Sequence, residues 1–214
     1  MRPIKLALAA KLALAAASLL LAAQAFAQAQ TVPAAGRQAD LDRIEAYLNG
    51  ITTAESDFTM VSPDGQVSRG RFDLSRPGRL RFDYAEPKGN LLIADGDYIV
   101  YWDARQKEAS NEPISDTPAS FLLKPHISLT DGVKITAFDH AAGMIRVTLV
   151  EAKEPGAGSV TIAFADQPLE LRAWRITDPQ GATTDVTFSG WHVGLSLDPG
   201  LFHFQDPNAG KRHR

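Results

Sequence analysis

Residues 74–102 read LSRPGRLRFDYAEPKGNLLIADGDYIVYW, and this stretch alternates in the manner of β-strands. One set of alternate positions holds the apolar residues Leu80, Phe82 and Tyr84, and the positions between them are charged. Asp95-Gly96 marks a tight turn between two apolar runs. Period-two alternation places alternate side chains on opposite faces of a sheet. The stretch therefore predicts three successive antiparallel strands.

The same pattern continues on both sides of this stretch. Strands are expected around Phe58–Met60 and Gly70–Leu74, and at VKITAF (133–138), MIRVTLVEA (144–152), GSVTIAF (158–164), LRAWRIT (171–177), TTDVTFSGW (183–191) and LFHF (201–204). This gives about 11 strands, most of them joined by links of hairpin length, so the sheet should be largely antiparallel. No segment alternates strand with helix, which argues against a parallel α/β fold.

One amphipathic helix is expected before the strands. Its apolar residues recur at helical spacing: Leu41, Ile44, Leu48 and Ile51. Asp40 is a suitable N-cap, and Asn49-Gly50 is a suitable stop. The apolar stripe of this helix must pack on another element.

A second, shorter helix is expected within TPASFLLK, residues 117–124. Thr117 can cap it, Pro118 suits the first helical position, and Pro125 ends it. It carries three consecutive apolar residues, Phe121, Leu122 and Leu123. A helix of barely two turns is unstable without packing, so it should lie against the sheet.

The first 27 residues have the form of a secretory signal. A basic start precedes an Ala- and Leu-rich run, and Ala25-Phe26-Ala27 resembles a cleavage site. The alternative is a permanent N-terminal anchor. We expect a signal peptide at residues 1–27, a flexible lead-in at 28–39, one domain at 40–207 and a basic tail at 208–214, in an exported protein.

Composition excludes some partners and some chemistry. Removal of the signal and its three basic residues leaves 19 Lys and Arg against 25 Asp and Glu, a formal net charge of −6, which argues against a nucleic-acid partner. The chain contains no cysteine, so an exported form would have no disulfide. No phosphate-binding glycine loop, GxSxG nucleophile motif or paired-histidine metal motif occurs. We expect no catalytic residues, metal or cofactor.

A large twisted sheet in one domain must curl. The apolar residues at alternate strand positions would then line a concave face. These residues are Phe58, Met60, Phe72, Leu80, Phe82, Leu92, Val100, Ile145, Val147 and Ile162. Periodicity does not distinguish a cavity from an ordinary filled core, so both interpretations stay open.

The order of these motifs resembles the LolA family of periplasmic carriers of outer-membrane lipoproteins. The resemblance rests on Phe58, Gly70-Arg71-Phe72, Arg76-Pro77, LRFDY, Pro87, Asp95-Gly96, YIVYWD, TPASFLL and LFHFQDP, which together span nearly the whole mature chain. Three features depart from the family pattern. Trp102-Asp103-Ala104 replaces the family's Y(D/N)P, and RQKEAS (105–110) stands where the family has a glutamine-containing strand. A short basic tail follows Pro207 in place of a longer extension.

The resemblance implies an incomplete, about 11-stranded antiparallel barrel with a short helical lid over an apolar cavity for lipoprotein acyl chains. It also implies a monomer that is loaded by an inner-membrane lipoprotein-releasing ABC transporter and unloaded to an outer-membrane acceptor. Phe121, Leu122 and Leu123 would belong to the lid. Arg76 would bond to the lid backbone and hold the empty form closed, as a latch.

From the residues alone, Arg76 has a second interpretation. Pro77 restricts its backbone, and a guanidinium near an apolar mouth must find acceptors, such as the free carbonyls at the end of a short helix. Equally, Arg76 could lie on a solvated face with Arg79 and Arg81. The alternatives for the whole chain are a lipid- or lipoprotein-sensing module on the same scaffold and, less well supported, a secreted enzyme.

Overall fold

A single antiparallel sheet of 11 strands dominates the fold. The computed structural model describes residues 34–117 and 120–207, and the sheet and its helices form the compact unit Ala35–Arg214. The expected signal peptide and the basic tail lie outside the described residues. In the described part, no helix is both long and apolar enough to span a membrane.

The elements follow one another along the chain with short connections. Their order is α2 (Ala34–Gly50), β1 (Thr53–Val61), β2 (Val67–Ser75), β3 (Arg79–Glu86), β4 (Leu91–Asp95), β5 (Tyr98–Asp103), β6 (Glu108–Pro113), η1 (Ile114–Asp116), α3 (Ser120–Leu123), β7 (Val133–Ala141), β8 (Met144–Glu151), η2 (Pro155–Ala157), β9 (Ser159–Ala165), β10 (Glu170–Thr177), β11 (Thr183–Val193) and η3 (Pro199–Phe202).

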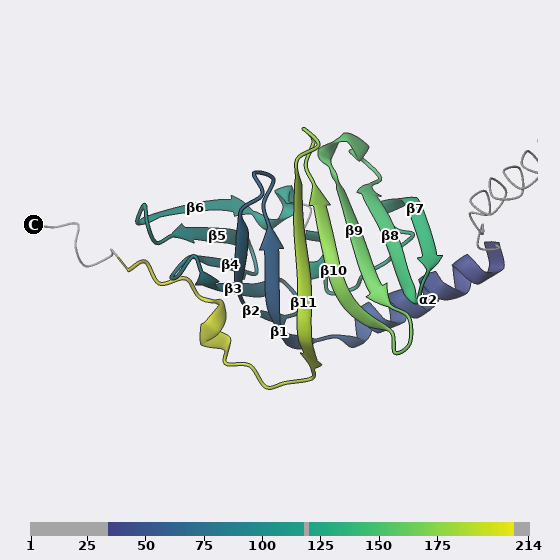
Figure 1. Ribbon diagram of the computed structural model, residues 1–214, viewed down its shortest axis with the longest axis horizontal. Helices are drawn as coiled ribbons and strands as arrows, with labels where there is room; N and C mark the ends of the chain where they lie inside the picture. The colour runs from purple at the N-terminus through teal and green to yellow at the C-terminus, as the bar shows by residue number, and fades with distance from the viewer. Residues whose placement is uncertain (1–33, 118–119, 208–214) are drawn as a thin grey trace, which may run out of the picture. The chain divides into compact units, whose positions relative to one another are not determined.

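The sheet is open. Its strand order is β6-β5-β4-β3-β2-β1-β11-β10-β9-β8-β7, so β6 and β7 form the two edges and the first and last strands pair in the middle. Figure 1 shows β4–β6 lying nearly across the direction of β1 and β11, as expected of a strongly twisted sheet. The prediction of a mainly β, unclosed antiparallel fold with about 11 strands is confirmed.

Two details of the strand assignment are wrong although the count agrees. LFHF is not a strand, because Pro199–Phe202 forms the 3-10 helix η3. The missed strand is β6, whose residues EASNEP are all exposed and carry no apolar alternation. β6 forms because the Asp103 carboxylate accepts from the amides of Arg105 and Gln106, which turns the chain back along β5.

Helix α2 is longer than expected. It begins at Ala34, so residues 34–39 are helical where a flexible lead-in was expected, and Asp40 is an interior residue, not the N-cap. The stretch before Asp40 contains alanine, arginine and glutamine, which favour helix and give it no reason to start later. The apolar stripe is as expected: Leu41, Ile44, Leu48 and Ile51 are all buried.

Aromatic rings pack the middle of the concave face. The ring centroid of Phe72 lies 4.8 Å from that of Phe82, 5.0 Å from Phe188 and 5.7 Å from Trp174. Phe58 joins the group 4.9 Å from Phe82. The centre of the interior is therefore a filled aromatic core that links β1, β2 and β3 to β10 and β11.

Close packing at this core explains one glycine. A Cβ at Gly70 would lie 1.9 Å from the carbonyl oxygen of Asp83 and 2.9 Å from the ring of Phe58. Neither neighbour can move away, since one is backbone and the other is buried. Only glycine fits where β2 passes between β1 and β3.

Candidate functional site: a lidded interior with two hollows

The segment after β6 covers the interior as the predicted lid would. The helix α3 comprises Ser120–Leu123 in the described part of the chain. Pro118, expected at the first helical position, lies outside the described residues. Phe121, Leu122 and Leu123 are buried, as predicted from their need for packing. Burial continues beyond the helix, because Ile127 and Leu129 are also buried. We call residues 114–117 and 120–129 the lid segment.

Arg76 lies in the turn between β2 and β3 and joins the lid segment to α2. Its Nη2 and Nε donate to the carbonyl oxygen of Lys124 at 2.8 and 3.2 Å. Its Nη1 donates to the carbonyls of Leu48 and Ile51, the latter at 3.2 Å. The carbonyls at a helix end lack helical partners, so one guanidinium satisfies acceptors from both helices.

The bonds of Arg76 are all to neutral oxygens. Burial lowers the pKa of Arg76, although a guanidinium stays charged near neutral pH. The backbone of the same turn also contacts the lid, since the Gly78 amide donates to the Leu123 carbonyl at 2.9 Å. The alternative in which Arg76 lies on a solvated face does not describe these contacts.

Two side chains of α2 hold the remainder of the lid segment. Asn49 Nδ2 donates to the Ile127 carbonyl at 2.8 Å, and the Ile127 amide donates back to Asn49 Oδ1 at 2.9 Å. The Leu129 amide donates to the Glu45 carboxylate at 2.8 Å. Sequence reasoning interpreted Asn49 only as a helix stop, because nothing local indicates a partner 78 positions away.

Beneath the lid segment almost no space remains. A hollow of only about 20 Å³ lies between Leu122 and Leu123 of the lid, Leu48 of α2, and Leu80 and Trp174 of the sheet. The lid side chains therefore occupy this part of the interior themselves.

A larger hollow lies beyond the aromatic core, where the β1–β2, β3–β4 and β10–β11 hairpins end. Its volume is about 420 Å³, within the roughly 300–1,000 Å³ typical of small-molecule pockets. The lining is apolar toward the core and polar toward the rim. It comprises Met60, Leu80, Phe82, Tyr84, Pro87, Leu92, Ile99, Tyr101, Trp174, Ile176 and Val186 together with Ser62, Gln66, Ser68, Asn90, Glu112, Thr117 and Thr184. We call it the main cavity of the interior; a larger and more open hollow of about 840 Å³ lies elsewhere, beside Arg71, Arg81 and Leu201.

The predicted lining residues fall into three groups. Met60, Leu80, Phe82 and Leu92 line the main cavity. Phe58 and Phe72 belong to the aromatic core, and Ile145, Val147 and Ile162 are buried in the half of the sheet formed by β8 and β9. The last residue, Val100, does not belong to this face.

The assignment of Val100 to the concave face is wrong. Residues that pair across neighbouring strands lie on the same face of the sheet. Val100 pairs with Ile93, which pairs with Arg81 on the outer face. Its neighbour Tyr101 pairs with Leu92, which lies on the inner face. In YIVYW every residue is apolar or aromatic, so alternation gives no indication of which alternate positions face inward. The outer face of β5 is itself covered, with the Phe204 ring 6.0 Å from that of Trp102.

A polar cluster ties α2 to the far half of the sheet. His140 Nδ1 lies 2.7 Å from Asp40 Oδ2, and its Nε2 lies 3.3 Å from Asp166 Oδ2. Arg43 bridges the same carboxylates, at 2.9 Å from Asp40 and 3.0 Å from Asp166. These four residues, the α2 clamp, join the helix to β7 and to the β9–β10 turn.

The α2 clamp favours the charged forms of both the His140 imidazole and the Asp166 carboxyl group. Partial burial opposes a charged imidazole, but the hydrogen bonds and charges of Asp40 and Asp166 outweigh it and raise the pKa of His140. The hydrogen bond from Arg43 is the largest influence on Asp166 and holds its pKa below the usual value. Within residues 34–117 and 120–207, no group of three or more His, Asp or Glu residues is arranged to hold a metal ion.

These features define a class of protein: an unclosed β-sheet that curls around an interior partly filled by its own lid segment and partly hollow. The family model "Outer membrane lipoprotein carrier protein LolA" matches residues 49–205, so the chain belongs to the LolA family. The matched range contains every strand, the lid segment and Arg76.

Individual relatives agree with this family. A protein of Methylococcus capsulatus named outer-membrane lipoprotein carrier protein is 29% identical over 189 residues, which covers 84% of this chain and 86% of the relative. A protein of the same name from Leptothrix cholodnii is 29% identical over 195 residues, with 84% and 90% covered. Among solved structures, a LolA superfamily protein from Nitrosomonas europaea is 8% identical with a TM-score of 0.42, and covers 77% of this chain and 97% of its own.

Proposed function

We propose that this protein is a periplasmic carrier of lipoproteins that holds their acyl chains in the main cavity. The observation that carries the proposal is a hollow of about 420 Å³ beside a lid segment whose apolar side chains are buried in the same interior. Family membership and the names of the relatives support it.

In this proposal the acyl chain first contacts the residues that already border the hollow, Met60, Leu80, Phe82 and Leu92. Longer or additional chains displace Phe121, Leu122 and Leu123 and then reach Phe58, Phe72, Ile145, Val147 and Ile162. Arg76 is the latch, since its bonds to Lys124 and to the end of α2 must break for the lid segment to lift away from the helix.

The energetics give a reason for such a lid. Burying a methylene contributes about 0.8 kcal/mol, so an acyl chain of some 15 methylenes gains roughly 12 kcal/mol if fully buried. A carrier with that affinity releases its cargo too slowly to deliver it. Lid side chains that compete for the same space lower the net affinity, so cargo can move on to a tighter site.

Delivery then needs partners on both sides of the carrier. The sequence has no phosphate-binding loop of the GxxxxGK[ST] form. We propose that an inner-membrane lipoprotein-releasing ABC transporter loads the protein, and that an outer-membrane acceptor with higher affinity receives the cargo from the monomeric carrier.

Displacement of an environment-sensitive apolar dye tests the function. We expect an acylated peptide to displace the dye from the purified protein at micromolar concentration or below. The same peptide without its acyl group is the control and should leave the dye bound. Failure of the acylated peptide to compete would overturn the carrier proposal.

A further inference from the structure

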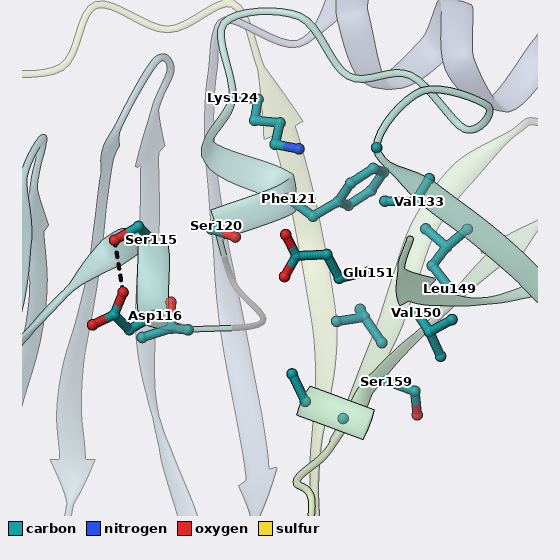
Figure 2. Close-up of a pocket in the computed structure, with 15 residues that line it drawn as sticks. Ser115, Asp116, Ser120, Phe121, Lys124, Val133, Leu149, Val150, Glu151 and Ser159 are labelled. Atoms are coloured by element: carbon teal, nitrogen blue, oxygen red, sulfur yellow. Dashed lines mark hydrogen bonds between the residues drawn. The ribbon is translucent and has the colours of Figure 1, made fainter. Parts of the chain in front are cut away.

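Another hollow lies on the other side of the lid segment, and its lining includes charged side chains. Its volume is about 90 Å³, and it lies between η1 and α3 on one wall and the ends of β7, β8 and β9 on the other (Figure 2). About half of the lining residues are polar or charged, namely Ser115, Asp116, Thr117, Ser120, Lys124, Glu151 and Ser159, and the rest are apolar residues and glycines. We call it the polar pocket.

Two opposite charges face each other across the polar pocket without forming a pair. Lys124 comes from the lid segment and Glu151 from the end of β8 (Figure 2). A Cβ built on Gly132 would lie 3.8 Å from Lys124 Nζ, which places the ammonium group beside the start of β7. Among the described residues, no hydrogen bond or salt bridge involves either charged side-chain group.

One pair of charged residues on the same strands does form a salt bridge. On the β7–β8 pair, Arg146 and Asp139 form a salt bridge at 2.9 Å. Lys124 and Glu151 thus present a donor and an acceptor that the protein leaves available at one place. Phe121, Leu149 and Val160 supply the apolar part of the same lining.

The polar pocket is next to the main cavity. Thr117 lines both hollows, so they approach each other at this residue. For a ligand with its chain in the main cavity, the polar pocket is therefore the neighbouring hollow on the far side of Thr117.

We propose that the polar pocket binds the main-chain amide next to the acylated residue of the cargo, an inference that rests on the proposed carrier function. The Lys124 ammonium donates to the peptide carbonyl, and the Glu151 carboxylate accepts from the peptide N–H. With a volume of about 90 Å³, the polar pocket is several times smaller than the main cavity and suits a small polar group such as one peptide unit. Main-chain recognition is independent of the cargo's sequence.

The test compares two probes that share one acyl chain. N-palmitoyl-glycylglycine amide carries peptide groups, and hexadecanol carries none. In dye displacement, Lys124→Met/Glu151→Gln should weaken binding of the lipopeptide by about threefold to tenfold, as expected for exposed charge-assisted hydrogen bonds, and should leave hexadecanol unchanged. Lys134→Met/Glu154→Gln, which alters exposed residues outside the pocket, is the matched control and should bind both probes like wild type.

Each other outcome counts against the inference. An unchanged lipopeptide affinity, or an equal loss for both probes, would overturn it while the carrier proposal stands. Binding of neither probe by the wild-type protein would instead overturn the carrier function, and this inference with it. Free glycylglycine amide should not compete detectably, because the pocket holds too little of it, and tight binding of that probe would make the pocket a peptide site unrelated to acylated cargo.

Discussion

At the scale of single residues, Arg76 has the most consequential position. Its guanidinium bonds to carbonyls of α2 and of the lid segment, which are otherwise joined through Asn49 and Glu45. A guanidinium suits this task because its donors point in several fixed directions in one plane. A lysine could satisfy only part of the same set.

Arg76→Leu should loosen the lid segment. The substitution leaves the carbonyls of Ile51 and Lys124 without their Arg76 donor and leaves the Leu48 carbonyl with the Ile51 amide alone. We expect a loss of about 2 kcal/mol or more in the free energy of unfolding. Amide hydrogen exchange of residues 120–129 should become faster. Release of bound cargo should become slower, so that cargo stays trapped on the carrier.

Arg69→Leu is the matched control for this variant. Arg69 forms an exposed salt bridge with Glu86 at 3.2 Å, and such pairs contribute less than about 1 kcal/mol. If Arg76→Leu and Arg69→Leu showed the same exchange and the same transfer as wild type, Arg76 would not be a latch.

At the scale of elements, α2 is held in its middle and at its C-terminal end. Its last turn shares Arg76 with the lid segment, and its middle is held by the α2 clamp.

The clamp depends on pH, because it contains an imidazole and carboxylates. His140 has a raised pKa, so its contribution is complete below the unfolded value of 6.5 and is lost as the pH rises through the folded value. Asp166 has a lowered pKa, so its contribution is complete above 3.8 and is lost as the pH falls through the folded value.

His140→Gln should therefore destabilise the protein in a pH-dependent way. We expect a loss of about 1 kcal/mol near pH 5.5, where both partners are charged, and a smaller loss near about pH 8.5. Thermal unfolding of wild type and variant at both pH values measures the difference. His192→Gln, at an exposed position on β11, should show no such trend. A difference between wild type and His140→Gln that stayed constant with pH would contradict the charged clamp.

At the scale of the whole described unit, the interior is divided by its aromatic core. On one side the lid segment leaves only about 20 Å³, and on the other the main cavity offers about 420 Å³. Closing the sheet into a barrel would remove its edges, but the open edges β6 and β7 let the lid segment cross from one to the other. The lid segment connects the two edge strands β6 and β7, so the sheet must stay open for the segment to cross the interior.

Leu92→Trp should fill part of the main cavity. We expect about a tenfold loss of affinity for an acylated peptide in dye displacement, because the added ring occupies space that the chain requires. The melting temperature should change little, since the hollow receives the ring without repacking the core. Val67→Trp, at a position with 46% exposure, is the control. Wild-type affinity in Leu92→Trp would place the acyl chain outside the main cavity.

Much of the fold follows from local pattern. Alternation at Leu80, Phe82 and Tyr84 predicts a strand because the two faces of a sheet differ in solvent contact. The same reasoning fails at β6, which has no apolar alternation and forms only as the partner of β5. It also fails at Leu201–Phe204, where aromatic residues cover the outer face near Trp102 without extending the sheet.

The site is less predictable than the sheet. Phe121, Leu122 and Leu123 are recognisable because a short apolar helix must be packed to exist. Ile127 and Leu129 lie outside any helix or strand, so no hydrophobic periodicity indicates that they are buried. Hydrogen bonds from their amides to Asn49 and Glu45 hold them against α2.

Local sequence pattern is enough to predict a long antiparallel sheet, an amphipathic helix and a short buried helical turn. Those features arise from side chains a few positions apart, whose spacing sets which face meets water. The outward position of Val100, the link that Arg76 makes between α2 and the lid segment, and the hollows on both sides of that segment are visible only in the folded chain. Those features depend on how residues far apart in the chain pack together, and the volume left unfilled is a property of the whole packing, not of any one segment.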